Sequence, residues 1–374
     1  MFELIMSAMT FFPDRVFSID LMKYSESEIE ACKKKFQLAL ERQSSSVIPC
    51  FDSCGSFCAF CLISIDPQAV EYCNGCNRRS YCSTGCREKD WTAEGYGQGH
   101  KKWCSLKVAE EGIDWEIRSV PNKGFGVIAK KLIPKRSRIM VEVPRPVTSE
   151  SVLELEPLYG TALEKERLNS FCTGEESLLF VRVARINHSC DSNACQSLEG
   201  RTMVVSAIRD IQPGEEICIN YTNINGRNTQ TDPESARELL LEKWGISCPD
   251  DCKCRNQQFI NDLRRCRSLD AEIADMLSRN DHVGGLKKVD ELLRLLTQIQ
   301  ATWGWYEHIY WAGFTFAVLQ DSGLGAAKTY GTEALKLHAS VHLPSSEQVD
   351  EIVEALDAPQ NFRMHLLKHA AQSA

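Results

Sequence analysis

Cysteine and histidine occur in closely spaced pairs in the first third of the chain, and thiolates and imidazole are the usual ligands of zinc. The pairs are Cys58 and Cys61, Cys73 and Cys76, Cys82 and Cys86, and His100 and Cys104. Two intervening residues let two sulfurs reach one ion across a tight turn, so eight donors predict two tetrahedral sites. Closed four-ligand sites are structural, so we expect these metals to hold a segment too short to build its own core. Cys50 and Cys54 are alternative donors.

A second group of cysteines lies further along the chain, at Cys248, Cys252 and Cys254. Three thiolates are one short of a closed zinc site, and the alternative is three unlinked buried thiols. The chain has 18 cysteines, and its first residues lack the pattern of a secretory signal. We therefore expect an intracellular protein, of the nucleus or the cytoplasm, whose cysteines bind metal. A secreted protein would use them in disulfides.

Three separated motifs combine glycine and polar residues in ways that suit a ligand site. They are KGFG at Lys123–Gly126, NHSC at Asn187–Cys190, and GEEICINY, which ends at Tyr221. Glycines let a backbone approach a ligand closely, and a polar cluster after an apolar run is unusual in a simple core. Taken one at a time, the first motif also fits an ordinary turn, the second a structural turn, and Tyr221 a half-buried packing residue.

The elements that must position these motifs are short strands followed by helices. Alternating or β-branched runs predict strands at 124–130, 138–144, 202–208 and 215–221. Helices are expected near 29–40, at 152–171 and after about position 263, where one apolar face repeats at helical spacing. This face comprises Leu286, Val289, Leu292, Leu293, Leu296 and Ile299. Segments 305–319 and 326–338 resemble a TPR-like helix pair, with a generic bundle as the alternative.

Composition limits the class of protein. With 374 residues, 43% of them hydrophobic and 25% charged, the chain is long enough for two or three globular domains. Its net charge of −8 argues against a protein that wraps nucleic acid, because phosphate neutralisation needs a basic face. No apolar run approaches the length of a membrane span, so we expect no membrane association.

The first cysteine-rich segment resembles a MYND zinc finger over its whole length. The resemblance is carried by CAFC, CNGC, YCSTGC, Trp91 and HKKWC. It implies that the pairs interleave, with Cys58, Cys61, Cys82 and Cys86 on one zinc and Cys73, Cys76, His100 and Cys104 on the other. It also implies a partner protein with a short peptide motif. Direct nucleic-acid binding by the finger is the weaker alternative, because its basic residues are balanced by acidic ones.

The three polar motifs, in this order, resemble a SET domain over roughly 113–256. The resemblance implies a site for S-adenosylmethionine (SAM) lined by backbone from Lys123 to Gly126, including Phe125. Asn187, His188 and Asn169 would bind polar groups of the cofactor, Trp244 and Ile246 would pack on its adenine, and Tyr221 would contact it and act as the catalytic residue. In the post-SET segment of the family, Cys190 would complete a third zinc site with Cys248, Cys252 and Cys254.

These resemblances imply an α+β fold and a SAM-dependent protein-lysine N-methyltransferase acting on a histone or another protein. The fold would be a β-rich SET domain with a zinc-stabilised MYND finger and a post-SET segment, followed by a helical C-terminal domain. The expected parts are a helical extension at 1–49, the finger at 50–104, the SET domain at 112–224, the post-SET segment at 238–258 and the helical domain at 263–372. The alternative is a weak or inactive SET-fold adaptor acting through its finger.

The finger precedes the glycine motif here, whereas in SMYD-type enzymes it interrupts the SET domain after that motif.

Overall fold

The computed structural model describes residues 58–362, apart from 62–64, 66–67, 78, 93–99, 103, 105–106, 122, 147–169, 173–176, 200–201, 228–230, 280, 321–322, 342–354 and 359. These residues form two compact units. The β-rich unit contains the described residues up to His188 together with Gln196–Ile219. The helical unit contains Ser189–Cys195 and the described residues from Asn220 onward.

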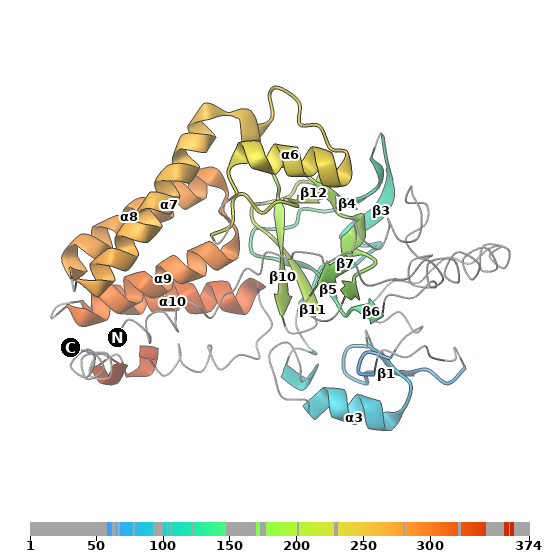
Figure 1. The fold of residues 1–374 in the computed structure, drawn as a ribbon. Helices are drawn as coiled ribbons and strands as arrows, with labels where there is room; N and C mark the ends of the chain where they lie inside the picture. Colours follow the sequence, from blue (N-terminus) through green and yellow to red (C-terminus); the bar gives the residue numbers. More distant parts are fainter. Residues whose placement is uncertain are drawn as a thin grey trace, which may run out of the picture. The chain divides into compact units, whose positions relative to one another are not determined.

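Short strands, arranged in small sheets, build the β-rich unit (Figure 1). The finger contributes β1 (Glu71–Tyr72), β2 (Ser80–Tyr81), α3 (Thr84–Thr92) and the 3-10 turn η1 (His100–Lys102). One sheet has the order β3 (Trp115–Val120), β4 (Gly124–Ala129), β12 (Glu216–Ile219) and β9 (Asn187–His188). A second has the order β10 (Ala194–Glu199), β11 (Thr202–Ala207) and β5 (Arg138–Glu142), and a third β6 (Arg145–Pro146), β8 (Ser177–Leu179) and β7 (Ser170–Cys172). The 3-10 turn η2 (Val183–Arg185) leads into β9.

The register of β12 matters most for the site. This strand pairs antiparallel with β4 and parallel with β9, so that Cys218 lies opposite Asn187 and Ile219 opposite His188. The strand that leads toward Tyr221 is therefore the direct neighbour of the Asn-His dipeptide. Strands at all four expected positions are confirmed, and most of their apolar residues are buried, Val127 completely.

The helical unit begins with a well-capped helix. Its helices are α6 (Pro233–Trp244), α7 (Gln257–Ser278), α8 (His282–Ile299), α9 (Trp303–Leu319) and α10 (Leu324–Val341), with the 3-10 turn η3 (Lys253–Arg255) before α7. The Asp232 side chain accepts backbone N–H bonds at the start of α6, and Gly245 ends the helix in the left-handed conformation, with φ of 67°. Trp244 is thereby held at a defined helix end.

Helix α7 lies against α8, α8 against α9, and α9 against α10 (Figure 1). Buried apolar side chains fill the contacts between them. On α8, four of the residues expected on one face, Val289, Leu292, Leu296 and Ile299, are buried, while Leu286 and Leu293 are half-buried. A Cβ atom at Gly285 would lie 2.3 Å from the Phe316 ring, so the glycine permits the close approach of α8 and α9. The helices in 305–319 and 326–338 are confirmed, and their description as a TPR-like pair remains a prediction.

The α+β fold with a helical C-terminal region is confirmed. The helix expected at 152–171 is wrong at its end, because Ser170 and Phe171 belong to strand β7, and the rest of it lies outside the described residues. The N-terminal helix expected near 29–40 also lies outside them. The exact domain limits remain predictions. None of the described helices is long and apolar enough to cross a bilayer.

Candidate functional site

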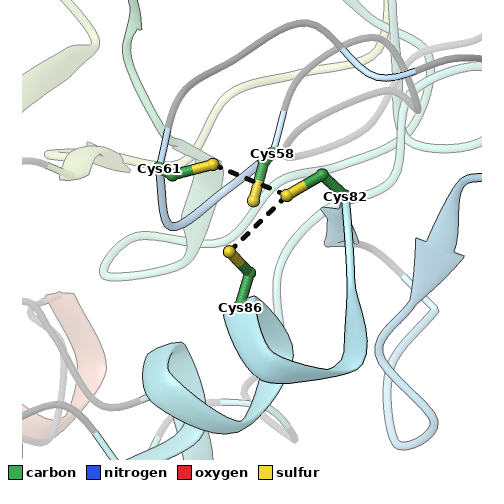
Figure 2. Close-up of side chains that lie close together, drawn as sticks. All are labelled: Cys58, Cys61, Cys82 and Cys86. Carbon is green, nitrogen blue, oxygen red and sulfur yellow. Dashed lines mark hydrogen bonds between the residues drawn. The ribbon is translucent and has the colours of Figure 1, made fainter.

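The first group of finger cysteines converges on one point. Cys58 and Cys61 belong to the loop that opens the finger, Cys82 follows β2, and Cys86 lies in the first turn of α3. Figure 2 shows the four sulfur atoms turned toward one another. The Sγ atom of Cys82 lies 3.6 Å from that of Cys61 and 3.5 Å from that of Cys86. All four sulfurs lie within 4.8 Å of one another.

The second group forms around a turn that only glycine fits. The Sγ atoms of Cys73 and Cys104 are 3.5 Å apart, and the Sγ atom of Cys76 is 3.3 Å from His100 Nε2. All four donor atoms again lie within 4.8 Å of one another. A Cβ atom at Gly75 would lie only 2.7 Å from the Sγ atom of Cys104. The structure thus brings the eight donors together in the interleaved grouping that the resemblance implies.

The spacing of the donor atoms suits tetrahedral zinc. Zinc–sulfur bonds of about 2.3 Å in tetrahedral geometry place neighbouring sulfurs about 3.8 Å apart. The observed separations of 3.5 and 3.6 Å are close to this, and far from the roughly 2.05 Å of a disulfide. Soft thiolates with one imidazole are also the donor set that zinc prefers. The residues present therefore fit zinc.

At the first site, local backbone groups favour the thiolate form of Cys58. Burial raises the pKa of Cys58, but hydrogen bonds from the backbone of Cys61, Cys82 and Phe60 outweigh it and lower the pKa to about 7. A thiolate is the form that binds metal, so these backbone hydrogen bonds favour the metal-binding form of Cys58.

A buried ion pair supports the finger between its two sites. The Tyr81 hydroxyl donates to Asp90 Oδ2 at 2.7 Å, and Arg79 Nε lies 3.2 Å from the same oxygen. Tyr81 is completely buried in a small cluster with Cys58, Cys73 and Cys104. Among the described residues of the finger, the apolar cluster is therefore small and is built largely around ligand residues and Tyr81.

The third cysteine cluster joins residues far apart in sequence. The Sγ atom of Cys190 lies 3.7 Å from that of Cys248, and those of Cys252 and Cys254 are 3.4 Å apart. All four sulfurs lie within 4.8 Å of one another. Burial and the charges of the other three cysteines raise the pKa of Cys190, so four ionised thiols need a cation among them. The four residues fit a closed zinc site of the kind that the resemblance implies.

Charged side chains brace this cluster. Lys253 Nζ lies 2.7 Å from Asp191 Oδ1, which links the two segments that carry the cysteines. Arg237 donates to the Cys254 carbonyl at 2.9 Å, and Arg255 to the Cys248 carbonyl at 3.3 Å. The ligand backbone is therefore held from helix α6 and turn η3 as well.

In the β-rich unit, the glycine motif and Asn187 meet around one carboxylate. The Asn187 side-chain amide donates to the Phe125 carbonyl at 3.0 Å and to Glu216 Oε1 at 2.7 Å. Both neighbours only accept, so the amide nitrogen must face them and Oδ1 faces away. A Cβ atom at Gly126 would lie 2.8 Å from Glu216 Oε1 and 2.9 Å from Asn187 Nδ2, so this close approach requires glycine. Gly124, with φ of 75°, requires glycine for its conformation.

The charges of Lys123 and Glu216 beside Asn187 neutralise each other in an ion pair. Lys123 Nζ lies 2.9 Å from Glu216 Oε2. Burial lowers the pKa of Lys123, but the Glu216 carboxylate raises it by more. Burial, with the charge of Lys123, lowers the pKa of His188 to about 4, so this imidazole is neutral near pH 7. Lys123 therefore serves as the counterion of Glu216.

The other predicted cofactor residues belong to the helical unit. Tyr221 follows β12 by two residues, and its ring lies 5.2 Å from that of Trp244, centroid to centroid. Ile246 follows Gly245, and its backbone N–H donates to the Leu240 carbonyl. The expected convergence of Tyr221 with the glycine motif and Asn187 remains a prediction.

Some site residues escaped the sequence reasoning, and others lie outside the described residues. Glu216, which holds both Asn187 and Lys123, lies in the GEEICINY motif, but nothing in that motif indicates these two contacts. Lys253 was missed because nothing in its spacing indicates the ion pair with Asp191. Asn169 and the alternative finger donors Cys50 and Cys54 fall outside the described residues.

Comparisons with known proteins identify two domains. Residues 58–104 match the MYND finger and residues 124–222 match the SET domain. The chain is 28% identical to the histone-lysine N-methyltransferase set5 of Schizosaccharomyces pombe, over 40% of this chain and 54% of that protein. It is 23% identical to the human histone-lysine N-methyltransferase SMYD3, over 68% of this chain and 61% of that one. It is 25% identical to the pig N-lysine methyltransferase SMYD2, over 46% and 45%. The chain thus spans about half to three fifths of these relatives.

Proposed function

We propose that this chain, whose residues match the MYND finger and the SET domain, is a SET-type protein-lysine N-methyltransferase that takes its methyl group from SAM. The observation that carries the proposal is the parallel pairing of β9 with β12. It sets Asn187 and His188 beside the strand that leads to Tyr221. Two of the three polar motifs are thereby joined in one sheet, although the paired residues Asn187 and Cys218 are 31 positions apart in the chain.

The residues of the β-rich unit fit a cofactor of this kind. Asn187 Oδ1, which faces away from Phe125 and Glu216, can accept hydrogen bonds from a cationic amino group. Because Gly126 has no side chain, the Asn187 amide can approach the backbone of the glycine motif closely. When bound, SAM supplies a methyl group on a cationic sulfur, which is ready for nucleophilic attack.

Tyr221 and Trp244 would act on the substrate lysine and on the cofactor. A lysine ammonium has a pKa near 10.4 and must lose a proton before its nitrogen can attack. Burial against apolar and aromatic walls lowers that pKa, because desolvation disfavours the charged form. The Tyr221 hydroxyl oxygen would accept a hydrogen bond from the neutral amine and so orient its lone pair. Trp244, in ring contact with Tyr221, would exclude water and pack with Ile246 on the adenine.

We propose three structural zinc ions. Cys58, Cys61, Cys82 and Cys86 would hold the first, Cys73, Cys76, His100 and Cys104 the second, and Cys190, Cys248, Cys252 and Cys254 the third. Four protein ligands leave no open position, so these ions would take no part in the chemistry. The third would fix the segment after Trp244 to the segment after His188.

The partners follow from the two domains. The substrate would be a protein with an accessible lysine, and the finger would bind a peptide motif of a partner protein. Most of the described cysteines lie in metal-type clusters, which is the use expected of thiols in the reducing interior of a cell. We therefore propose residence in the nucleus or cytoplasm.

The direct test is methyl transfer from labelled SAM. Purified protein is incubated with labelled SAM and fractionated cell extract, and labelled lysines are identified by mass spectrometry. Tyr221→Phe removes one hydroxyl and is expected to lower labelling by about 100-fold, as the loss of an orienting group does. Tyr72→Phe, at an exposed tyrosine of the finger, is the matched control and is expected to label as the wild type does.

The outcomes separate the enzyme from the adaptor. Equal labelling by Tyr221→Phe and the wild type would remove Tyr221 from the mechanism. A wild type that binds SAM but labels no lysine, or that binds no SAM, would instead support the adaptor alternative.

A further inference from the structure

The segment that follows Tyr221 is folded tightly on itself. Asn220 Oδ1 accepts hydrogen bonds from the backbone and the hydroxyl of Thr222, at 3.0 and 2.8 Å. The Asn223 N–H donates to the Asn220 carbonyl, and the Gly226 N–H to the Asn223 carbonyl. Asn223 has a φ of 49°, which is uncommon outside glycine. Asn220–Arg227 is therefore a compact turn with Tyr221 as its second residue, and we call it the tyrosine turn.

Helices of the C-terminal region hold this turn through its backbone. The Asn225 side chain donates to the Gln300 carbonyl at the end of α8, at 2.8 Å, and the Thr302 N–H donates to the Asn225 carbonyl at 3.3 Å. Arg267, on α7, donates to the carbonyls of Ile224 and Thr231 at 3.4 and 3.0 Å. Ile224 and Asn225 of the turn, and Thr231 just beyond it, are thus tied to α7 and to the connection between α8 and α9.

A charged network completes the attachment. Arg227 Nε lies 3.1 Å from Asp270 Oδ2 on α7, and His308 Nε2, on α9, lies 3.2 Å from Asp270 Oδ1. The His308 side chain is only 4% exposed, and those of Arg227 and Asp270 are less than 20% exposed. Burial raises the pKa of Asp270, but the bond from His308 and the charge of Arg227 lower it by more. The carboxylate therefore stays ionised between its two partners.

Such a network is a poor way to gain stability. Removing charges from water is costly, and apolar residues of similar size often stabilise a core as well or better. Directional contacts at fixed distances instead select one arrangement of the groups that they join. Here they join the tyrosine turn to α7 and α9, so they fix the path of the chain just beyond Tyr221.

We infer that Arg227, Asp270 and His308 are positioning residues for Tyr221, through which helices α7 and α9 set the geometry of methyl transfer. The inference rests on the proposed function. None of the three would touch the substrate; they would hold the turn in which the tyrosine lies. Reaction rates depend steeply on such placement, because a shift of about 1 Å in a reacting group can cost about 100-fold.

The test compares two identical substitutions on helix α7. Asp270→Asn removes the central charge of the network, whereas Asp275→Asn removes an exposed aspartate that pairs with Arg279 at the surface. Asp270→Asn is expected to lower kcat by about 10- to 100-fold while the Kd for SAM stays unchanged. Asp275→Asn is expected to change neither. A lower kcat together with equally weakened SAM binding would indicate general damage and would overturn the inference.

Two further variants separate positioning from folding. Arg227→Met with Asp270→Leu and His308→Leu replaces the whole network by apolar side chains and leaves no buried donor without an acceptor, so it is expected to restore the melting temperature but not kcat. His308→Leu alone removes one hydrogen-bond partner of Asp270 and leaves the ion pair, so a smaller loss of kcat is expected. Recovery of kcat along with stability in the apolar triple variant would show that the network is only structural.

Amide hydrogen exchange provides a readout that needs no activity. In Asp270→Asn the N–H groups of Asn223 and Gly226 are expected to exchange faster than in the wild type, while those of α8 remain protected. Unchanged exchange at both amides overturns the inference, whether or not the chain methylates protein. A wild type without SAM binding, by contrast, overturns the proposed function.

Discussion

The finger and the C-terminal helices are held by different kinds of contact. The apolar cluster of the finger is small, and six of its members are cysteines, beside Ala59, Ile65, Tyr81 and the neighbouring Val143. Helices α7 to α9 bury large apolar side chains such as Leu263, Leu292, Trp305 and Phe316 completely. A short segment cannot bury enough apolar surface to offset its lost conformational freedom, whereas packed helices can. We therefore expect the finger to depend on metal and the helices on packing.

The cluster around Cys190 lies between these two cases. Its sulfurs resemble those of the finger in spacing, yet Cys190 and Cys248 are separated by 58 positions. A metal here would join distant segments of a unit that also has an apolar core.

Removal of zinc should separate the two regions most clearly. In zinc-finger peptides the metal contributes about 10–16 kcal/mol of apparent folding free energy, so a strong chelator is expected to unfold the finger. Hydrogen exchange should then show loss of protection in 58–104 and retained protection in α7 to α9. Loss of protection in the helices together with the finger would show that the helices also depend on metal.

Gly75→Ala should damage one finger site without touching the other region. Its Cβ atom would lie 2.7 Å from the Cys104 sulfur, so the second site must distort. We expect a bound zinc content lower by about one ion per chain, measured by atomic absorption. Gly85→Ala is the matched control, since its Cβ atom meets only Ser83 Oγ at 3.9 Å. A full zinc content in Gly75→Ala would show that the turn tolerates a side chain.

Leu292→Ala should weaken the helices by packing alone. Leu292 is completely buried, so the substitution is expected to lower the free energy of unfolding by about 2–5 kcal/mol. Leu241→Ala, at a side chain that is 58% exposed, is the control and should change it by less than about 0.5 kcal/mol. Urea unfolding followed by circular dichroism measures both, and zinc content should stay constant. Loss of zinc in Leu292→Ala would show that metal binding depends on the packing of the helices.

The smallest effect concerns the start of α6. Asp232 accepts bonds from the side chain and backbone of Ser235 and the backbone of Glu234, which lower its pKa. Asp232→Ala is expected to cost about 1 kcal/mol of stability at neutral pH. Because the folded pKa is lowered, the charge-dependent part is fully present above the ordinary aspartate pKa and is lost as the pH falls through the lowered value. Asp232→Asn, which keeps the cap, should vary less with pH; an equal pH dependence would contradict this.

Features that depend on neighbours in sequence were predictable. The finger donors were recognisable because pairs such as Cys58 and Cys61 lie across one tight turn, whatever the rest of the chain does. The strands around Gly124 and Glu216 followed from alternation and β-branched residues. The apolar face of α8 followed from its repeat, because helical geometry places such residues on one side.

Tertiary structure alone decided which distant groups meet. Nothing in the order of residues placed Glu216 against both Asn187 and Lys123, or Arg227 against Asp270 and His308. These contacts depend on strand register and on the angle between packed helices, which many residues set together. Local spacing therefore determined the ligand pairs of the finger and the elements. Folding decided which distant groups meet, including Cys190 with Cys248, because the sequence around a charged or thiol side chain does not specify its distant partner.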